Sequence, residues 1–111
     1  MREREGCEVL CRCFKAAGVD IEENVRFVES GVDVSLDGWD PRRRIGYEFI
    51  TDEAGDRAEF TSDVIDALER RMEAGELYVF LVDETNIADA GRLASAAEAF
   101  LAQLRARGVL S

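Results

Sequence analysis

The chain has 111 residues, 47% of them hydrophobic, which suits one ordinary domain with a single core, so we predict one domain over residues 1–111. Its 24 acidic and 14 basic residues give a formal net charge of -10, which opposes binding to nucleic acid or to an anionic membrane. Histidine is absent, which excludes the commonest acid–base group and the commonest transition-metal ligand.

Targeting features are missing as well. The sequence contains no apolar stretch of about 20 residues that could span a bilayer, and its first five residues lead into no signal-like region. We therefore expect a soluble, intracellular protein of the cytoplasm with no membrane partner. In that setting Cys7, Cys11 and Cys13 should be reduced thiols that pack as small buried groups, with redox sensing or an intermolecular zinc site as the alternative.

Hydrophobic periodicity predicts the first half of the chain as a helix and a three-stranded meander. The helix runs from residue 3 or 5 to residue 17 and is stopped by Gly18. An acidic loop over residues 20–24 follows. The three strands are then expected at residues 25–29, 32–39 and 46–51.

The second half is predicted as a helix, a strand and a helix. After a polar loop over residues 52–59, a helix is capped at position 61, 62 or 63 and closed by Gly75. The unbroken apolar run over residues 77–82 is typical of a strand buried on both faces, parallel to its neighbour and central in the sheet. The last helix starts near residues 87–89 and ends at residue 107.

The predicted order is therefore α-β-β-β-α-β-α. This order indicates an α/β (α+β) fold in which helices flank a mixed sheet of about four strands. A helical crossover is expected to return the fourth strand to a place beside the first.

The hairpin over residues 32–50 is the most informative part of the chain. Apolar residues alternate with others in both of its strands, and Asp37 and Glu48 fall on the less apolar face. Two registers fit this pattern. A wide loop pairs Asp37 with Arg44 and leaves Glu48 opposite Asp33, whereas a tight loop places Asp37 directly across from Glu48.

Turn chemistry favours the tight register. It makes a type I turn with Asp40 first and Pro41 second, where the fixed φ of proline suits the bend. Asp40 also stays extended, as a residue before proline prefers. Trp39 then lies opposite Gly46, so that the indole covers a residue without a side chain.

In this register two like charges face each other, which destabilises a sheet unless a cation, an arginine or a raised pKa compensates. A divalent ion is one such compensation, and carboxylate oxygens suit Mg²⁺. Asp37, Glu48 and Asp33 are the candidate metal ligands, to which Glu5 or Glu8 of the first helix could be added. The alternative is that the strand acids simply face solvent.

The element order and the hairpin resemble a known family. The order α-β-β-β-α-β, with Asp37-Gly38-Trp39 followed by Tyr47-Glu48-Phe49, resembles the restriction-endonuclease-like, or PD-(D/E)XK, nuclease superfamily, some phage-type and repair-type members of which carry a D-G-Y…Y-E-F hairpin. The topology covers most of the chain, and the motif covers about fifteen residues.

The resemblance implies roles for three positions. In that family the Asp of the second strand and the Glu of an E-x-K tripeptide bind Mg²⁺, and the Lys orients or activates the attacking water. By position, Asp37 and Glu48 would be the metal-binding catalytic pair, and Ile50 occupies the lysine site without a donor or a charge. Lys15 is the single lysine in the chain, and arginine, such as Arg26, is excluded as a general base by its pKa.

Two functions therefore remain open. The first is a non-catalytic binding or regulatory module on a nuclease-like core, such as an immunity protein, an inhibitor or a DNA-mimicking decoy, whose acidic clusters at residues 20–23 and 52–59 meet a basic protein partner. The second is a Mg²⁺-dependent nuclease, a phosphodiesterase that uses Asp37 and Glu48. A symmetric homodimer also stays open, for the case that Tyr78 or Phe80, or the apolar side of the last helix, is exposed.

Overall fold

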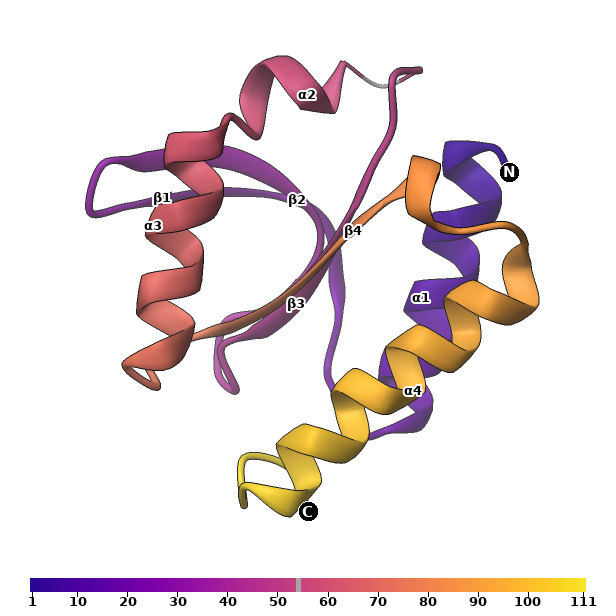
Figure 1. Cartoon of the computed structure of the whole chain (residues 1–111). Coiled ribbons are helices and arrows are strands. Elements are labelled where there is room, and N and C mark those ends of the chain that lie inside the picture. Colours follow the sequence, from indigo (N-terminus) through magenta and orange to yellow (C-terminus); the bar gives the residue numbers. More distant parts are fainter. Residues whose placement is uncertain (54) are drawn as a thin grey trace.

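The computed structural model describes residues 1–53 and 55–111. It contains a sheet between two layers of helices, with α3 on one face and α1 beside α4 on the other (Figure 1). The predicted order and the mixed four-stranded sheet are confirmed. The elements are α1 (Glu3–Ala16), β1 (Glu22–Glu29), β2 (Val32–Asp40), β3 (Ile45–Ile50), α2 (Asp56–Glu59), α3 (Ser62–Glu73), β4 (Tyr78–Asp83), a 3-10 turn (Glu84–Asn86) and α4 (Ala90–Ala106).

Local signals account for most of the helix ends. The Thr61 side chain accepts a hydrogen bond from the N–H of Val64 at 3.3 Å and begins α3. Asp89 accepts one from the N–H of Arg92 at 2.8 Å and begins α4. Two expectations for loops were wrong, because β1 starts inside the predicted acidic loop and the short helix α2 lies inside the predicted polar loop.

The position of β4 differs from the prediction. The strands are ordered β1-β2-β3-β4, and β4 pairs in parallel with β3, so it lies at an edge and not beside β1 or in the centre. The β1–β2 hairpin bends toward α3 in Figure 1, which carries its outer edge away from the plane of β3 and β4. β4 is apolar although it is an edge strand, because α3 packs on one of its faces and α4 on the other.

The strand that is buried on both faces is β3. Tyr47 and Phe49 belong to the core between the sheet and the helices α1 and α4, whereas Ile50 belongs to the core between the sheet and α3. Glu48 is itself 0% exposed. The expected less apolar face of this strand therefore does not face solvent, because helices cover both sides of β3.

The tight hairpin register is confirmed. Trp39 pairs with Gly46, and Asp40 pairs with Ile45. The Asp40 side chain accepts the N–H of Arg42 at 3.0 Å, which fixes the start of the turn. A Cβ on Gly46 would lie 2.8 Å from the Trp39 ring, so the position opposite the indole has room only for glycine.

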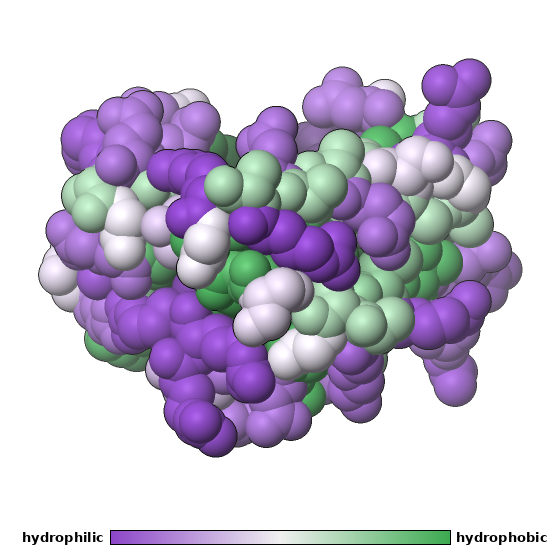
Figure 2. All heavy atoms as spheres, turned by 90° about the horizontal axis from the view of Figure 1, so that it is seen from below, coloured by the Kyte–Doolittle hydropathy of each residue, from purple (hydrophilic) through white to green (hydrophobic). Residues whose placement is uncertain are grey.

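The outer surface is mixed in character. Seen from below in Figure 2, hydrophilic residues are interspersed with smaller apolar areas. Within the described part of the chain, no helix combines the length and the apolar character that crossing a bilayer requires.

Candidate metal centre

Asp37 lies where the pairing of β2 is interrupted. On one side, the β1–β2 register passes over Asn24 and Asp37, and on the other the β2–β3 register ends at Gly38 and Tyr47. Asn24 has a φ of 54°, in the left-handed region, which disturbs the ladder locally. Side-chain acceptors take the place of the missing ladder bonds.

Those acceptors are the two carboxylates that the sequence singles out. The N–H of Asp37 donates to Oε1 of Glu48 at 2.9 Å, and the N–H of Phe49 donates to Oδ2 of Asp37 at 2.8 Å. These two hydrogen bonds tie each side chain to the backbone of the opposite strand and hold it in place. The structure therefore brings Asp37 and Glu48 together as predicted.

Glu48 is the most strongly perturbed acid of the site. Burial, followed by the charges of Asp37 and Asp56, raises the pKa of Glu48 to about 11. Burial also raises the pKa of Asp37. No described group donates a hydrogen bond to the buried Oε2 atom of Glu48, and its acidic neighbours Asp37 and Asp56 are the side chains that can accept a proton from Glu48. In the absence of a cation, Glu48 thus holds a proton at neutral pH. The raised pKa of Glu48 removes the repulsion that two facing negative charges would cause.

Two further carboxylates, those of Glu3 and Asp56, are held by Thr51, the residue after β3. The Thr51 hydroxyl donates to Oε2 of Glu3 at 2.7 Å, and its backbone N–H donates to Oδ2 of Asp56 at 3.0 Å. Burial raises the pKa of Glu3, and the charge of Asp37 acts in the same direction. The first turns of α1 and α2 therefore each supply one carboxylate to the site.

Cys7 extends the site on α1. Its Sγ lies 3.8 Å from Oε1 of Glu3, and one ligand atom each of Glu3, Cys7 and Asp37 lies within 4.8 Å of the other two. The thiol is half-buried, and burial raises its pKa. The three residues open into a hollow of about 510 Å³ whose other acidic lining is Glu8, Glu23 and Glu53.

Sequence reasoning missed Glu3 and Asp56 as site residues and placed Cys7 in the core. A signal for Glu3 exists, because residues 3 and 7 are one turn apart on the face of α1 that also carries Leu10 and Phe14. No comparable signal marks Asp56, since α2 is too short to show a period. The helix carboxylate that was anticipated at Glu5 or Glu8 is supplied instead by Glu3.

The other predicted ligand lies outside this group. The side chain of Asp33 is 56% exposed and forms an ion pair with Arg26 at 2.7 Å. Lys15 follows Glu3 by twelve residues along α1, which at 1.5 Å per residue separates them by about 18 Å. Among the described residues, no arginine or lysine forms an ion pair with a site carboxylate.

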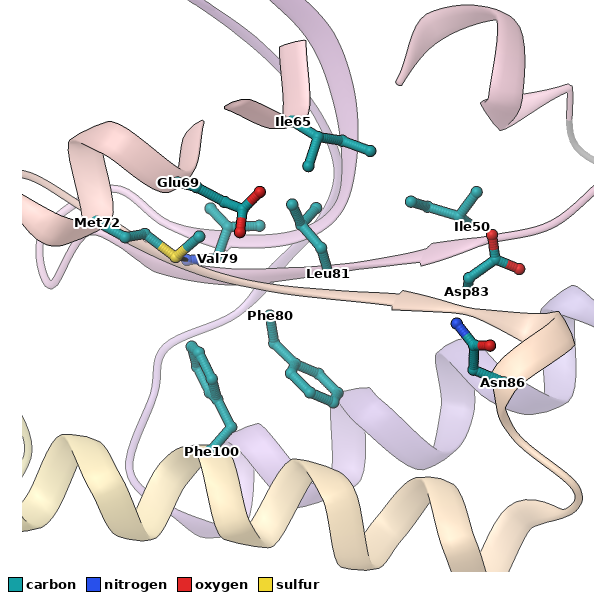
Figure 3. Close-up of a pocket in the computed structure, with 10 residues that line it drawn as sticks. All are labelled: Ile50, Ile65, Glu69, Met72, Val79, Phe80, Leu81, Asp83, Asn86 and Phe100. Atoms are coloured by element: carbon teal, nitrogen blue, oxygen red, sulfur yellow. Dashed lines mark hydrogen bonds between the residues drawn. The ribbon is translucent and has the colours of Figure 1, made fainter. Parts of the chain in front are cut away.

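A second hollow, of about 400 Å³, lies at the edge formed by β4 (Figure 3). Ile65 and Met72 of α3 line it above the strand, and Phe80 with Phe100 of α4 lie below. Its carboxylates are far apart in this view: Glu69 is near Met72, and Asp83 is at the other end, where it accepts hydrogen bonds from Arg57. Most of its lining is apolar, and its two carboxylates do not lie together.

Comparison of the chain with family models, with curated proteins and with solved structures finds no match. The chemistry of the site is therefore inferred from its own side chains. Carboxylates and one thiol can hold a divalent cation. The only basic side chain described in the lining of the hollow is Arg4, which pairs with Glu8 and cannot act as a general base.

Proposed function

We propose that the protein is a non-catalytic binding module that holds a divalent cation at Asp37 and Glu48, with Glu3 from α1. The observation that carries this proposal is Glu48, which is 0% exposed and has one oxygen without a partner beside the charges of Asp37 and Asp56. A buried acid in that setting is costly. A cation would displace its proton and offset the like charges.

The absence of catalysis in this proposal rests on Ile50. In the resemblance to PD-(D/E)XK nucleases, position 50 corresponds to the lysine that orients the attacking water. Ile50 is 6% exposed and packs in the core with residues of α3. Lys15 lies too far along α1 to replace it, and the Arg44 guanidinium is bound to Glu29 at 2.7 Å. A bound cation would then position a ligand without activating water.

We further propose a basic protein partner in the cytoplasm. The net charge of -10 and the acidic rim of the hollow at Glu8, Glu23 and Glu53 support it, since such a field speeds encounter with a positive surface. The same charge disfavours nucleic acid as the ligand.

Thermal unfolding with increasing Mg²⁺, Mn²⁺ or Ca²⁺ tests the cation site. The Tm is expected to rise with ion concentration by mass action, and Asp37→Asn should abolish the rise while it keeps an acceptor for the Phe49 N–H. Asp33→Asn is the matched control, because it removes an exposed carboxylate from the same strand and should leave the rise unchanged. Equal shifts in both variants, or none in the wild type, would contradict the site.

A Mg²⁺-dependent nuclease is the second candidate. The pairing of Asp37 with Glu48 beside an open hollow favours it. Incubation with single-stranded and double-stranded DNA and RNA in Mg²⁺ or Mn²⁺ separates the two functions. Cleavage that Asp37→Asn removes and Asp33→Asn preserves would establish the nuclease. A metal-dependent Tm rise without cleavage would support the binding module.

A further inference from the structure

The possible metal ligands of the site are not all carboxylate oxygens. Besides Glu3 and Asp37 they include the Cys7 sulfur, and the three ligand atoms lie within 4.8 Å of one another. Bonds of about 2.0–2.3 Å from zinc to oxygen and sulfur place tetrahedral ligands roughly 3.6 Å apart. Small side-chain movements would therefore close these three groups around one ion.

The packing of α1 fixes the thiol at this place. Gly6 lies against the Phe49 ring, where a Cβ would come within 2.4 Å of the ring carbons, so α1 approaches β3 closely at this point. Cys7 is the next residue, and Glu3 precedes it by one helical turn on the same face. Both ligand atoms thus come from one rigid helix and are presented to Asp37.

An independent feature also points to a ligand. Glu48 is fully buried, its Oε1 accepts a hydrogen bond from the N–H of Asp37, and no described group donates to its Oε2. Glu48 is not one of the three residues whose ligand atoms lie close to one another, but it contacts Asp37 directly. A cation bound at Asp37 would offset the cost of burying these two neighbouring acids.

We propose that Cys7 is a metal ligand and that Glu3, Cys7 and Asp37 form a site that selects zinc-class cations over Mg²⁺. This inference rests on the proposed cation site and specifies the class of ion that it binds. A thiolate ligand favours Zn²⁺, Co²⁺ and Cd²⁺, whereas Mg²⁺ takes oxygen ligands. As the metal–sulfur bond forms, the Cys7 S–H bond breaks and its proton passes to the solvent, with no change of oxidation state.

Co²⁺ titration of the metal-free protein tests this directly. A thiolate bound to Co²⁺ gives a sulfur-to-metal charge-transfer band in the near ultraviolet. We expect this band to saturate at one equivalent and to disappear when Zn²⁺ is added. Cys7→Ser should remove the band and weaken Zn²⁺ binding by more than about tenfold, the least that even outer-shell partners typically contribute.

Matched controls are available on the same helix. Cys11→Ser and Cys13→Ser should keep the band, because the ligand group includes neither thiol. The Tm of each metal-free variant checks folding, and Cys7→Ala provides a second variant without the new hydroxyl.

The possible results separate the inference from the proposal on which it rests. Co²⁺ binding without the band, or a band that Cys7→Ser leaves intact, would overturn the role of Cys7, while stabilisation by Mg²⁺ that depends on Asp37 would preserve the cation site. Failure of Co²⁺, Zn²⁺ and Mg²⁺ to bind at all would contradict both.

Discussion

The carboxylates of Asp37 and Glu48 each accept a backbone N–H from the opposite strand, at 2.8 and 2.9 Å. Each side chain is therefore part of the hairpin as well as a candidate ligand. Replacement by the corresponding amide keeps one acceptor oxygen, whereas alanine removes it and leaves a buried N–H unpaired. Amide variants are the informative ones at this site.

Glu48→Gln should stabilise the metal-free protein at neutral pH. The pKa of Glu48 is about 11 in the native state against an ordinary value of 4.5. Between these values the native state holds a proton that the unfolded chain lacks, so stability falls as pH rises, by up to ~1.4 kcal/mol per pH unit. Urea unfolding at pH 5.5 to 8 in a chelating buffer should show this slope in the wild type and a flatter profile in the variant.

At pH 7 the Gln variant is expected to be more stable by about 2 kcal/mol, because it removes a buried ionisable group and keeps its shape. The same variant should lose stabilisation by added cations. If it were less stable than the wild type across the whole pH range, the raised pKa of Glu48 would be wrong.

Glu29→Gln should destabilise the protein at neutral pH, and this loss of stability should shrink as the pH falls. Hydrogen bonds from Arg44 and Arg71 lower the pKa of Glu29 to about 2. The stabilisation is complete above the ordinary value of 4.5 and is lost as pH falls through 2. Because the side chain is 34% exposed, solvent screens the pair and the variant should lose only about 1 kcal/mol at neutral pH.

Acid unfolding curves check this prediction, since the two proteins should converge near the native pKa. Asp33→Asn is a suitable control, because its ion pair with Arg26 is more exposed and should contribute less. A constant difference between Glu29→Gln and the wild type from pH 7 to pH 2 would exclude the ion pairs as the cause.

Gly38→Ala should destabilise the protein by about 1–3 kcal/mol through overpacking. A Cβ at this position would lie 2.3 Å from the Tyr47 ring, which is itself fully buried. Gly91→Ala, in the first turn of α4, meets only Asp89 at 3.4 Å and should be neutral or stabilising by up to about 1 kcal/mol. Guanidinium unfolding of both variants provides the comparison, and equal effects would contradict the close packing.

The free edge of β4 should be visible in amide hydrogen exchange. The N–H of Tyr78 donates toward β3, so by strand alternation the N–H of Phe80 faces β3 and that of Leu81 faces away. We expect Leu81 to exchange faster than Phe80. Protection of Leu81 that grows with protein concentration would instead show that a second copy covers the edge.

Local chemistry made the hairpin predictable, and long-range packing made the rest of the site unpredictable. The register follows from the Asp40 turn and from Gly46 opposite Trp39, which are neighbours along the chain. Asp33 and Asp37 look equivalent in a period of two, yet only Asp37 lies at the interruption of β2. That difference depends on how the hairpin bends.

The remaining site residues depend on contacts across the whole chain. Thr51 joins Glu3, 48 residues before it, to Asp56 in a helix of only four residues. Similarly, β4 could be recognised as a strand from its apolar run, but its place at the edge is set by its parallel pairing with β3, a contact between distant parts of the chain. Periodicity reports burial and not which neighbour provides it.

Ile50 has a consequence for protein engineering. Its side chain is enclosed with residues of α3, so Ile50→Lys would place an ammonium group in an apolar core. In a hydrolytic enzyme built on this scaffold, a basic side chain would be easier to introduce on the open side of the site, where Arg4 and Glu8 line the hollow with Asp37.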